Sequence, residues 1–340
     1  MDQYPQEYFQ PAPQNSGQGE AITFSPSTYR KKVWYRLKEN KSAIFALAAI
    51  GFLVLMGILG PLLTPFKYSD QILELRNKPP GYKFYVKILE NEKGNLQIIE
   101  VSEKPILPAA GYIVESRRFW VGSDSLGRDL FTRNCYGARI SLALGIATAI
   151  IVLVAGTIYG GISGYLGGWV DEIMMRIVEV LSAVPFLLYV ILLMVLMEPG
   201  LKTIFIAIGV VHWVPMARLV RGQILSLKEQ EYIMAARSLG AGMGRLLYRH
   251  LIPNVAGLVI AYVVLAIPEA IFTEAWLSFL GLGVAAPVAS WGTLVNDGIK
   301  GIRSYPWQFF LPAFFVSLTI FSFNVLGEGL KESFDPRLRR

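Results

Sequence analysis

The side chains that could carry out chemistry in this sequence are few and scattered. It contains one cysteine, Cys135, and two histidines, His212 and His250. One cysteine excludes a disulfide framework and a cysteine-rich zinc site, and no second metal-type residue lies near His212 in the sequence. No phosphate-binding loop, zinc-protease motif or nucleophile elbow occurs. We therefore expect no catalytic residue, no metal site and no cofactor in this chain.

Three glutamates stand out because they lie within or beside long apolar runs, where an ionised group is costly and suggests a function. Glu179 follows Arg176 by three residues, so a structural ion pair is favoured over a substrate ligand. Glu269 lies deep in its run and is the stronger pathway candidate, whereas Glu274 could face an outer vestibule. His212 is favoured as a packed or pore-wall residue. These four residues are the candidate translocation pathway.

The composition indicates what surrounds these side chains. Hydrophobic residues make up 53% and charged residues 17% of the 340 residues, and the mean hydropathy is +0.44. Soluble domains carry about 25% charged residues. The net charge of +7 is too thinly spread for a nucleic-acid-binding surface, which needs many Lys and Arg in one patch. The chain is therefore predicted to be a membrane protein without a nucleic-acid partner.

Six apolar runs predict an all-α, polytopic protein with six transmembrane helices, because the bilayer core needs about 20 apolar residues per helix. The fourth run is the shortest. The runs cover residues 43–65, 140–170, 180–197, 203–217, 255–283 and 304–327.

Basic residues set the predicted orientation. Lys and Arg concentrate before the first run, between the fourth and fifth runs, and after the sixth. By the positive-inside rule, both termini of this multi-pass protein are cytoplasmic. Residues 1–42 then form an N-terminal tail without a cleavable signal peptide, and 331–340 a C-terminal tail. Residues 66–136 lie outside, and 137–330 form a five-helix core containing a cytoplasmic loop at 222–254.

The outer segment contains two stretches rich in β-forming residues. Residues 82–89 and 96–101 flank a turn-rich connection at 91–95, where Gly94 can take a positive φ. We expect a small extracytoplasmic β-hairpin insertion between the first and second membrane helices. The alternative is a disordered loop.

The cytoplasmic loop is the most informative segment. Small and apolar residues spaced by three and four predict a short helix with one apolar stripe. Gly240 then ends this helix, and a second short helix over 245–251 ends before Pro253. A basic, amphipathic pair of helices could lie on anionic lipid or dock into a groove of a soluble partner, and the residues alone favour neither. The stripe consists of Tyr232, Ala235, Ala236 and Leu239.

The spacing of Ala236, Gly240 and Pro253 resembles the EAA loop of ABC-importer permeases. This sequence departs from that pattern at Met234, which replaces the acidic residue, and at His250, which replaces an isoleucine. Three further segments, at 120–142, 278–292 and 326–338, resemble the peptide and nickel branch of the family, and within it the C-type subunit of oligopeptide and dipeptide permeases.

The resemblance implies a type I ABC importer-like fold in the cell (inner or cytoplasmic) membrane. The chain would form half of a translocation pathway and couple to ATPases through residues 229–253. The implied partners are a second homologous permease subunit, two ATP-binding cassette ATPase subunits that use ATP and Mg, an extracytoplasmic substrate-binding protein, membrane lipid and a peptide substrate. The implied coupling residues are Glu231, Ala235, Ala236, Arg237, Gly240, Ile252 and Pro253.

Other functions remain as alternatives. A stand-alone ion-coupled secondary transporter or channel would need paired intramembrane carboxylates and inverted repeats with broken helices, and the sequence shows no clear repeat. An intramembrane enzyme would need a nucleophile and a base, and no such pair is evident. Peptide is the substrate that the resemblance favours, although related permeases handle nickel complexes or opines.

Overall fold

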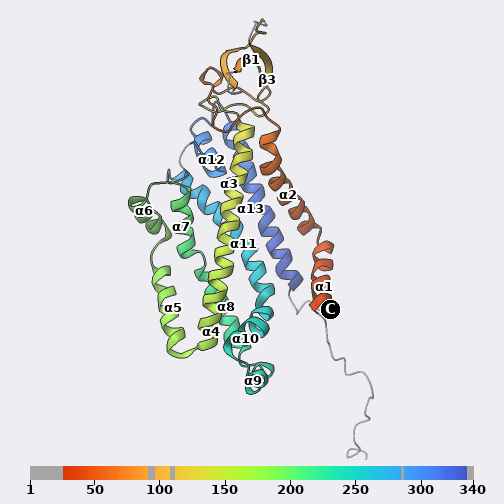
Figure 1. The fold of residues 1–340 in the computed structure, drawn as a ribbon, viewed down its shortest axis with the longest axis vertical. Helices are drawn as coiled ribbons and strands as arrows, with labels where there is room; N and C mark the ends of the chain where they lie inside the picture. Colours follow the sequence, from red (N-terminus) through yellow and green to blue (C-terminus); the bar gives the residue numbers. More distant parts are fainter. Residues whose placement is uncertain (1–25, 91–95, 108–111, 285–286, 335–340) are drawn as a thin grey trace, which may run out of the picture.

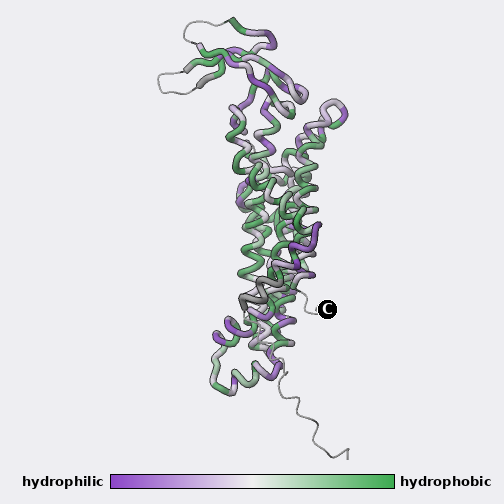
Figure 2. Tube along the Cα trace, turned by 90° about the vertical axis from the view of Figure 1, so that its right-hand side faces the viewer, coloured by the Kyte–Doolittle hydropathy of each residue, from purple (hydrophilic) through white to green (hydrophobic). Residues whose placement is uncertain are grey.

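The computed structural model describes residues 26–90, 96–107, 112–284 and 287–334. It is an elongated helical bundle with a small β-sheet at one end and two short helices at the other (Figure 1). Apolar residues dominate the middle of the bundle, and hydrophilic residues gather towards both ends (Figure 2). The turn expected at 91–95, with Gly94, lies outside the described residues, as do the first 25 and the last six residues of the expected tails.

Five helical stretches are long and apolar enough to cross a membrane. The first comprises α2 (Lys41–Leu59) and η2 (Gly60–Leu62), and the second α3 (Leu130–Ile151), the π-turn η4 (Val152–Gly156) and α4 (Thr157–Leu166). The third comprises α7 (Leu201–Val211) and α8 (Val214–Leu227). The fourth comprises α10 (Met243–Leu246), the π-turn η5 (Leu247–Leu251) and α11 (Ile252–Phe279). The fifth is α13 (Trp307–Phe334). Outside these stretches lie α1 (Pro26–Glu39), η3 (Leu73–Leu75), α9 (Glu231–Ser238) and α12 (Trp291–Ile299).

A sixth crossing exists only if two bent helices count as one. The run expected to span at 180–197 is divided between α5 (Gly168–Ala183) and α6 (Phe186–Leu196), whose axes are bent by 81°. Pro185 explains the break, because proline lacks a backbone N–H and disfavours helical geometry in the residue before it. Val184 is accordingly extended, with φ −87° and ψ 125°. The run at 180–197 is therefore not the straight helix that the sequence predicts.

Two helix boundaries also differ from the prediction. The second membrane helix begins at Leu130, earlier than the predicted start at residue 140, because the Asp129 side chain accepts a hydrogen bond from the Thr132 amide at 2.7 Å and caps it. This helix ends at Leu166, before the predicted end at residue 170, and a tight turn at Gly167 and Gly168 follows, so that Asp171 belongs to α5.

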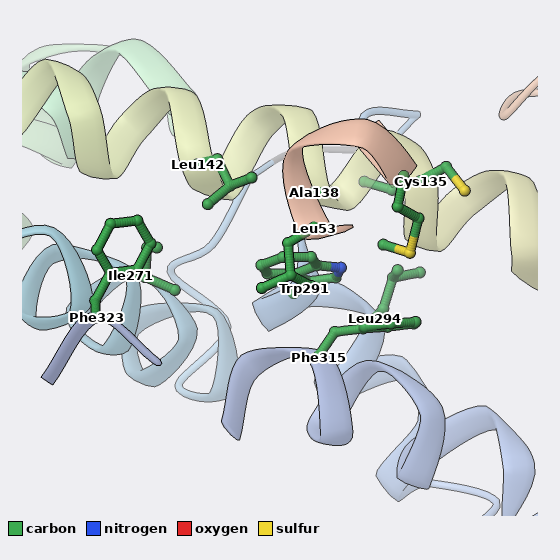
Figure 3. Packing of buried hydrophobic residues seen from close by; sticks show 11 residues of the cluster. Leu53, Cys135, Ala138, Leu142, Ile271, Trp291, Leu294, Phe315 and Phe323 are labelled. Atoms are coloured by element: carbon green, nitrogen blue, oxygen red, sulfur yellow. The ribbon is translucent and has the colours of Figure 1, made fainter. Parts of the chain in front are cut away.

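The core beside the sheet is organised around Trp291, the first residue of α12 (Figure 3). Its side chain is fully buried, and its indole N–H donates a hydrogen bond of 3.1 Å to the Asn134 carbonyl oxygen in α3. The indole stacks on Phe315 of α13 with ring centroids 6.0 Å apart. Leu53 of α2 and Ile271 of α11 belong to the same buried cluster. This contact set holds the helices together at the end of the bundle near the sheet.

The insert is a three-stranded antiparallel sheet in the order β2-β1-β3. β1 (Lys83–Glu90) pairs with β2 (Leu96–Ser102), as the predicted hairpin requires, and also with β3 (Ile113–Arg118), which the sequence did not indicate. Alternate residues of β1, namely Phe84, Val86 and Ile88, are buried on one face. Gln308 of α13 ties the base of this domain to the bundle by donating hydrogen bonds of 2.9 Å to the Asn77 side chain and the Ser123 carbonyl.

Candidate functional site

The loop that the sequence singles out is a short helix seated on the end of the bundle opposite the sheet (Figure 1). α9 points Ile233 inward, where its side chain is only 2% exposed. Ile233 belongs to a buried cluster with Leu246 and Leu251 of the following helical segment and with residues of α8 and α11. The cluster therefore fixes α9 to two membrane helices.

The other face of α9 is mostly exposed, and its one hydrogen bond to the bundle among the described residues is donated by the Asn254 side-chain amide of α11 to the Tyr232 hydroxyl at 3.1 Å. Tyr232 is 44% and Leu239 89% exposed, and Ala235 is exposed between them. The predicted stripe is therefore divided: only Ala236 packs against the cluster, and the other three residues form an outward ridge. The inward anchor, Ile233, was not part of the predicted stripe. An exposed leucine beside an exposed tyrosine is typical of a surface that another protein covers.

Gly240 ends α9 in a left-handed conformation, with φ +83°. Its N–H donates to the Arg237 carbonyl at 3.0 Å, and the Ala241 N–H donates to the Ala236 carbonyl at 3.1 Å. This pair of bonds is a Schellman motif, which favours glycine at its left-handed position. No described atom lies within 4 Å of the position that a Cβ would take on Gly240. Backbone conformation, and not crowding within this chain, therefore requires this glycine.

The remaining coupling candidates lie at the two ends of the loop. Glu231 and Arg237 occupy the first and last turns of α9, where their charges complement the helix dipole, and both are exposed. Ile252 is partly buried against the cluster. Pro253 does not end a helix as predicted: it lies in the first turn of α11, where a missing N–H is tolerated. The segment from Met243 therefore runs as one helical stretch into the membrane.

A second contact fastens the neighbouring helices to α8. Asp171 of α5 accepts two hydrogen bonds of 2.5 Å from the Arg221 guanidinium, a bidentate geometry, and a third from Ser163 of α4. Close backbone packing reinforces this pair, since a Cβ on Gly160 would stand 2.3 Å from the Ala217 carbonyl oxygen. Sequence reasoning missed the ion pair because its partners are fifty positions apart in the chain.

The pathway candidates do not form one group. Glu179 pairs with Arg176 at 2.7 Å, as the spacing predicts, and both side chains are largely exposed. Glu274 is 0% exposed, and its Oε1 accepts hydrogen bonds from Ser278 at 2.8 Å and from Ser290 at 2.6 Å. Glu274 thus joins α11 to the start of α12 and does not line the cavity described next.

His212 and Glu269 do lie together, in the wall of one cavity of about 390 Å³. The cavity lies where α5 meets α6, where α7 meets α8, and beside α11. The His212 ring meets Phe186 edge-on, with ring centroids 5.3 Å apart. Its buried Nδ1 has no hydrogen-bond partner in the described part of the chain. Within the same part, no three His, Cys, Asp or Glu side chains come together in a way that could hold a metal ion.

Comparisons with known proteins match the chain to the family of transport permeases that its sequence resembles. Residues 156–340 match the family model described as "Binding-protein-dependent transport system inner membrane component", and residues 28–80 match the "N-terminal TM domain of oligopeptide transport permease C". The chain is 43% identical to the oligopeptide transport system permease protein OppC of Bacillus subtilis, over 100% of both chains. It is 44% identical to the dipeptide transport system permease protein DppC of the same species, over 100% of this chain and 95% of that one. Haemophilus influenzae OppC is 40% identical over 89% of this chain and 87% of its own.

Proposed function

This chain belongs to the family of binding-protein-dependent transport system inner membrane components, and on that premise we propose that it is a permease subunit of an ATP-driven importer of oligopeptides or dipeptides. As a multi-pass, non-catalytic permease it forms half of the translocation pathway with a second permease subunit. ATP hydrolysis belongs to separate ATPase subunits, which use ATP and Mg. A stand-alone ion-coupled carrier is not favoured, because the relatives are named as permease proteins of peptide transport systems.

The outward ridge on α9 is the observation that carries the coupling role. Ile233 holds the helix on the bundle, and Leu239 faces away from it. Tyr232 is exposed on the same ridge, although its hydroxyl also accepts a hydrogen bond from Asn254. An amphipathic helix that presents a small apolar ridge fits a groove on a soluble protein. The ridge is therefore the surface to which an ATPase subunit binds. Glu231 and Arg237 add charge at the two ends of α9.

The helical continuity behind the loop gives this contact a mechanical consequence. Helical structure runs without interruption from Met243 to Phe279, and α9 is joined to it through the buried cluster. Movement of α9 during ATPase closure is therefore carried into α11, which also bears Glu269 in the cavity wall. The spans would then rock as rigid bodies between inward-facing and outward-facing states.

The arrangement of the ends supports an orientation in the inner or cytoplasmic membrane. α9, α1 and the last turn of α13 lie at the end opposite the sheet (Figure 1), and the basic residues that follow the positive-inside rule belong to these segments. We assign this end to the cytoplasm. The sheet then lies outside, beside the surface that receives the extracytoplasmic substrate-binding protein.

The remaining candidates take two different roles. Glu179 and its partner Arg176 are exposed on a helix at membrane depth, where charged groups usually face a water-filled path or a partner subunit and not lipid. Glu274 is proposed as an anchor between α11 and α12, because both serines that bond to it come from these elements or their caps.

Reconstitution tests this function. The chain is assembled in proteoliposomes with the second permease subunit, the ATPases and the binding protein, and uptake of a labelled tripeptide is measured. ATP is expected to drive uptake, and vesicles with an ion gradient but no ATP are expected to show none. Uptake by the isolated chain on an ion gradient alone would establish the carrier alternative instead.

A further inference from the structure

Two breaks in membrane helices, and a proline within a third, unbroken helix, lie at the cavity that contains His212 and Glu269. The bend between α5 and α6 contributes Val184 and Pro185 to the wall, and the junction between α7 and α8 contributes His212. α11 carries Pro268 within its helix, next to Glu269. Irregular backbone at membrane depth is tolerated where it is buried in protein or lines a water-filled space. Substrate sites of other membrane carriers are built from such broken helices.

Glu269 differs from the other two glutamates of the candidate pathway. Glu179 is paired with Arg176, and Glu274 with two serines. Within the described residues, no hydrogen bond or ion pair engages the Glu269 carboxylate, and the nearby Thr273 hydroxyl donates to the Glu269 backbone carbonyl at 2.8 Å. The Glu269 side chain is exposed on this chain, in the same wall as His212. A carboxylate without an ion pair within a membrane-spanning helix is costly unless a partner or a ligand covers it. The cavity is therefore suited to a ligand that brings a positive charge.

One cation beside the cavity, Arg218, is already bound to a residue of the wall. Arg218 of α8 donates a hydrogen bond of 2.8 Å to the Ser182 hydroxyl, and Ser182 belongs to the cavity wall. The guanidinium is thus fixed on the α5 side and makes no ion pair with Glu269. A divalent metal ion would need several oxygen ligands, and Glu269 is the single carboxylate in the wall. The remaining wall is mainly apolar, formed by residues such as Leu181, Val184 and Phe186.

We propose that this cavity is a subsite for the α-ammonium group of the transported peptide, with the Glu269 carboxylate as its anionic partner. The proposal rests on the proposed function, because it requires that peptides pass through this subunit. The free amino terminus of a peptide has a pKa of about 8 and is charged at neutral pH. Its contact with Glu269 is a charge-assisted hydrogen bond, and the apolar wall accommodates the first side chain. A cavity of about 390 Å³ is within the usual size of small-ligand sites.

Uptake of two peptides by matched variants tests this subsite. The probes are Ala-Ala-Phe and N-acetyl-Ala-Ala-Phe, supplied at equal occupancy of the same binding protein to complexes of wild type, Glu269→Gln and Glu172→Gln. Glu172 is an exposed glutamate of α5 outside the cavity. Because one binding protein loads every variant, its own selectivity cancels in the comparison. Glu269→Gln should reduce the preference for the free amine about tenfold or more, as expected for loss of a charged hydrogen bond. Glu172→Gln should leave it unchanged.

A measurement on the wild-type complex covers the case in which Glu269→Gln does not assemble. A water-soluble carbodiimide activates a carboxylate, and an amine in contact with it then forms an amide with release of the urea. Mass spectrometry should find Ala-Ala-Phe joined to Glu269 but not to Glu172, and no adduct with the acetylated peptide. An unchanged preference in Glu269→Gln, or absence of the Glu269 adduct while the complex still imports peptide on ATP, would overturn the subsite alone. Absence of ATP-driven uptake by wild type would instead overturn the proposed function.

Discussion

Gly240→Ala should weaken coupling without harming the membrane bundle. Gly240 has φ +83°, and no described atom would meet its added Cβ, so the whole cost is backbone strain. An alanine in the left-handed region costs about 1–2 kcal/mol. This cost corresponds to about a fivefold to thirtyfold shift in the equilibrium between the formed and the unformed turn at the end of α9. The strain acts on the Schellman turn that fixes Leu239 at the end of the ridge.

Gly242→Ala provides the matched control. Gly242 also has open space around its Cβ position, but its φ is −72°, which alanine adopts readily. The assay is ATP hydrolysis stimulated by peptide-loaded binding protein, with peptide uptake measured in the same proteoliposomes. Gly240→Ala should lower both activities severalfold with an unchanged melting temperature of the bundle, and Gly240→Asn should restore part of the loss, since asparagine tolerates this conformation. Equal activities in Gly240→Ala and Gly242→Ala would refute the reasoning.

Three further predictions concern the ridge, the ion pair and the N-terminal end of α3. Leu239→Asp should abolish co-purification of the ATPase subunits while the melting temperature stays constant, because Leu239 is 89% exposed; a parallel loss of stability would contradict this. Asp171→Asn should lower stability by about 1–3 kcal/mol, because it weakens a charged, bidentate contact with Arg221, and thermal unfolding measures it against Glu172→Gln. Burial raises the pKa of Asp129 from 3.8 to about 6. The folded state therefore binds the Asp129 proton more tightly than the unfolded state does. The stabilisation that comes from this protonation is present below about pH 4 and is lost as the pH rises through 6. Asp129→Asn should therefore flatten the change in melting temperature between pH 4 and 7.

The sequence predicted the membrane helices well, because a run of about 20 apolar residues is a strong signal. It misjudged the run at 180–197, because Pro185 lies inside this otherwise apolar run and hydropathy does not record a break in backbone geometry. The sequence did not predict strand β3, because four of its six residues, Glu115 to Arg118, are polar or charged. Its pairing with β1 is set by the tertiary fold and not by its own pattern.

The loop that contains α9 was also predicted only in part. The spacing of Ala236, Gly240 and Pro253 located the loop, but it did not identify which face is buried. α9 has two apolar stripes, one through Ile233 and Ala236 and one through Tyr232 and Leu239, and both fit helical periodicity. Packing against α8 and α11 decides between them. Contacts between distant residues, such as the ion pair of Asp171 with Arg221, leave no local pattern and required the structure.

Site-directed cross-linking of α9 tests the coupling role most directly. Single cysteines are placed at Leu239 and Ala235 on the ridge and at Ile233 on the buried face, and the assembled importer is treated with a short bifunctional thiol–amine reagent. The native Cys135 is buried and should contribute little background. Cross-links from positions 239 and 235 to an ATPase subunit, with none from 233, are the expected result. An importer that remains assembled and active but shows no link from either ridge position to the ATPase would contradict the assignment of α9 as the coupling helix.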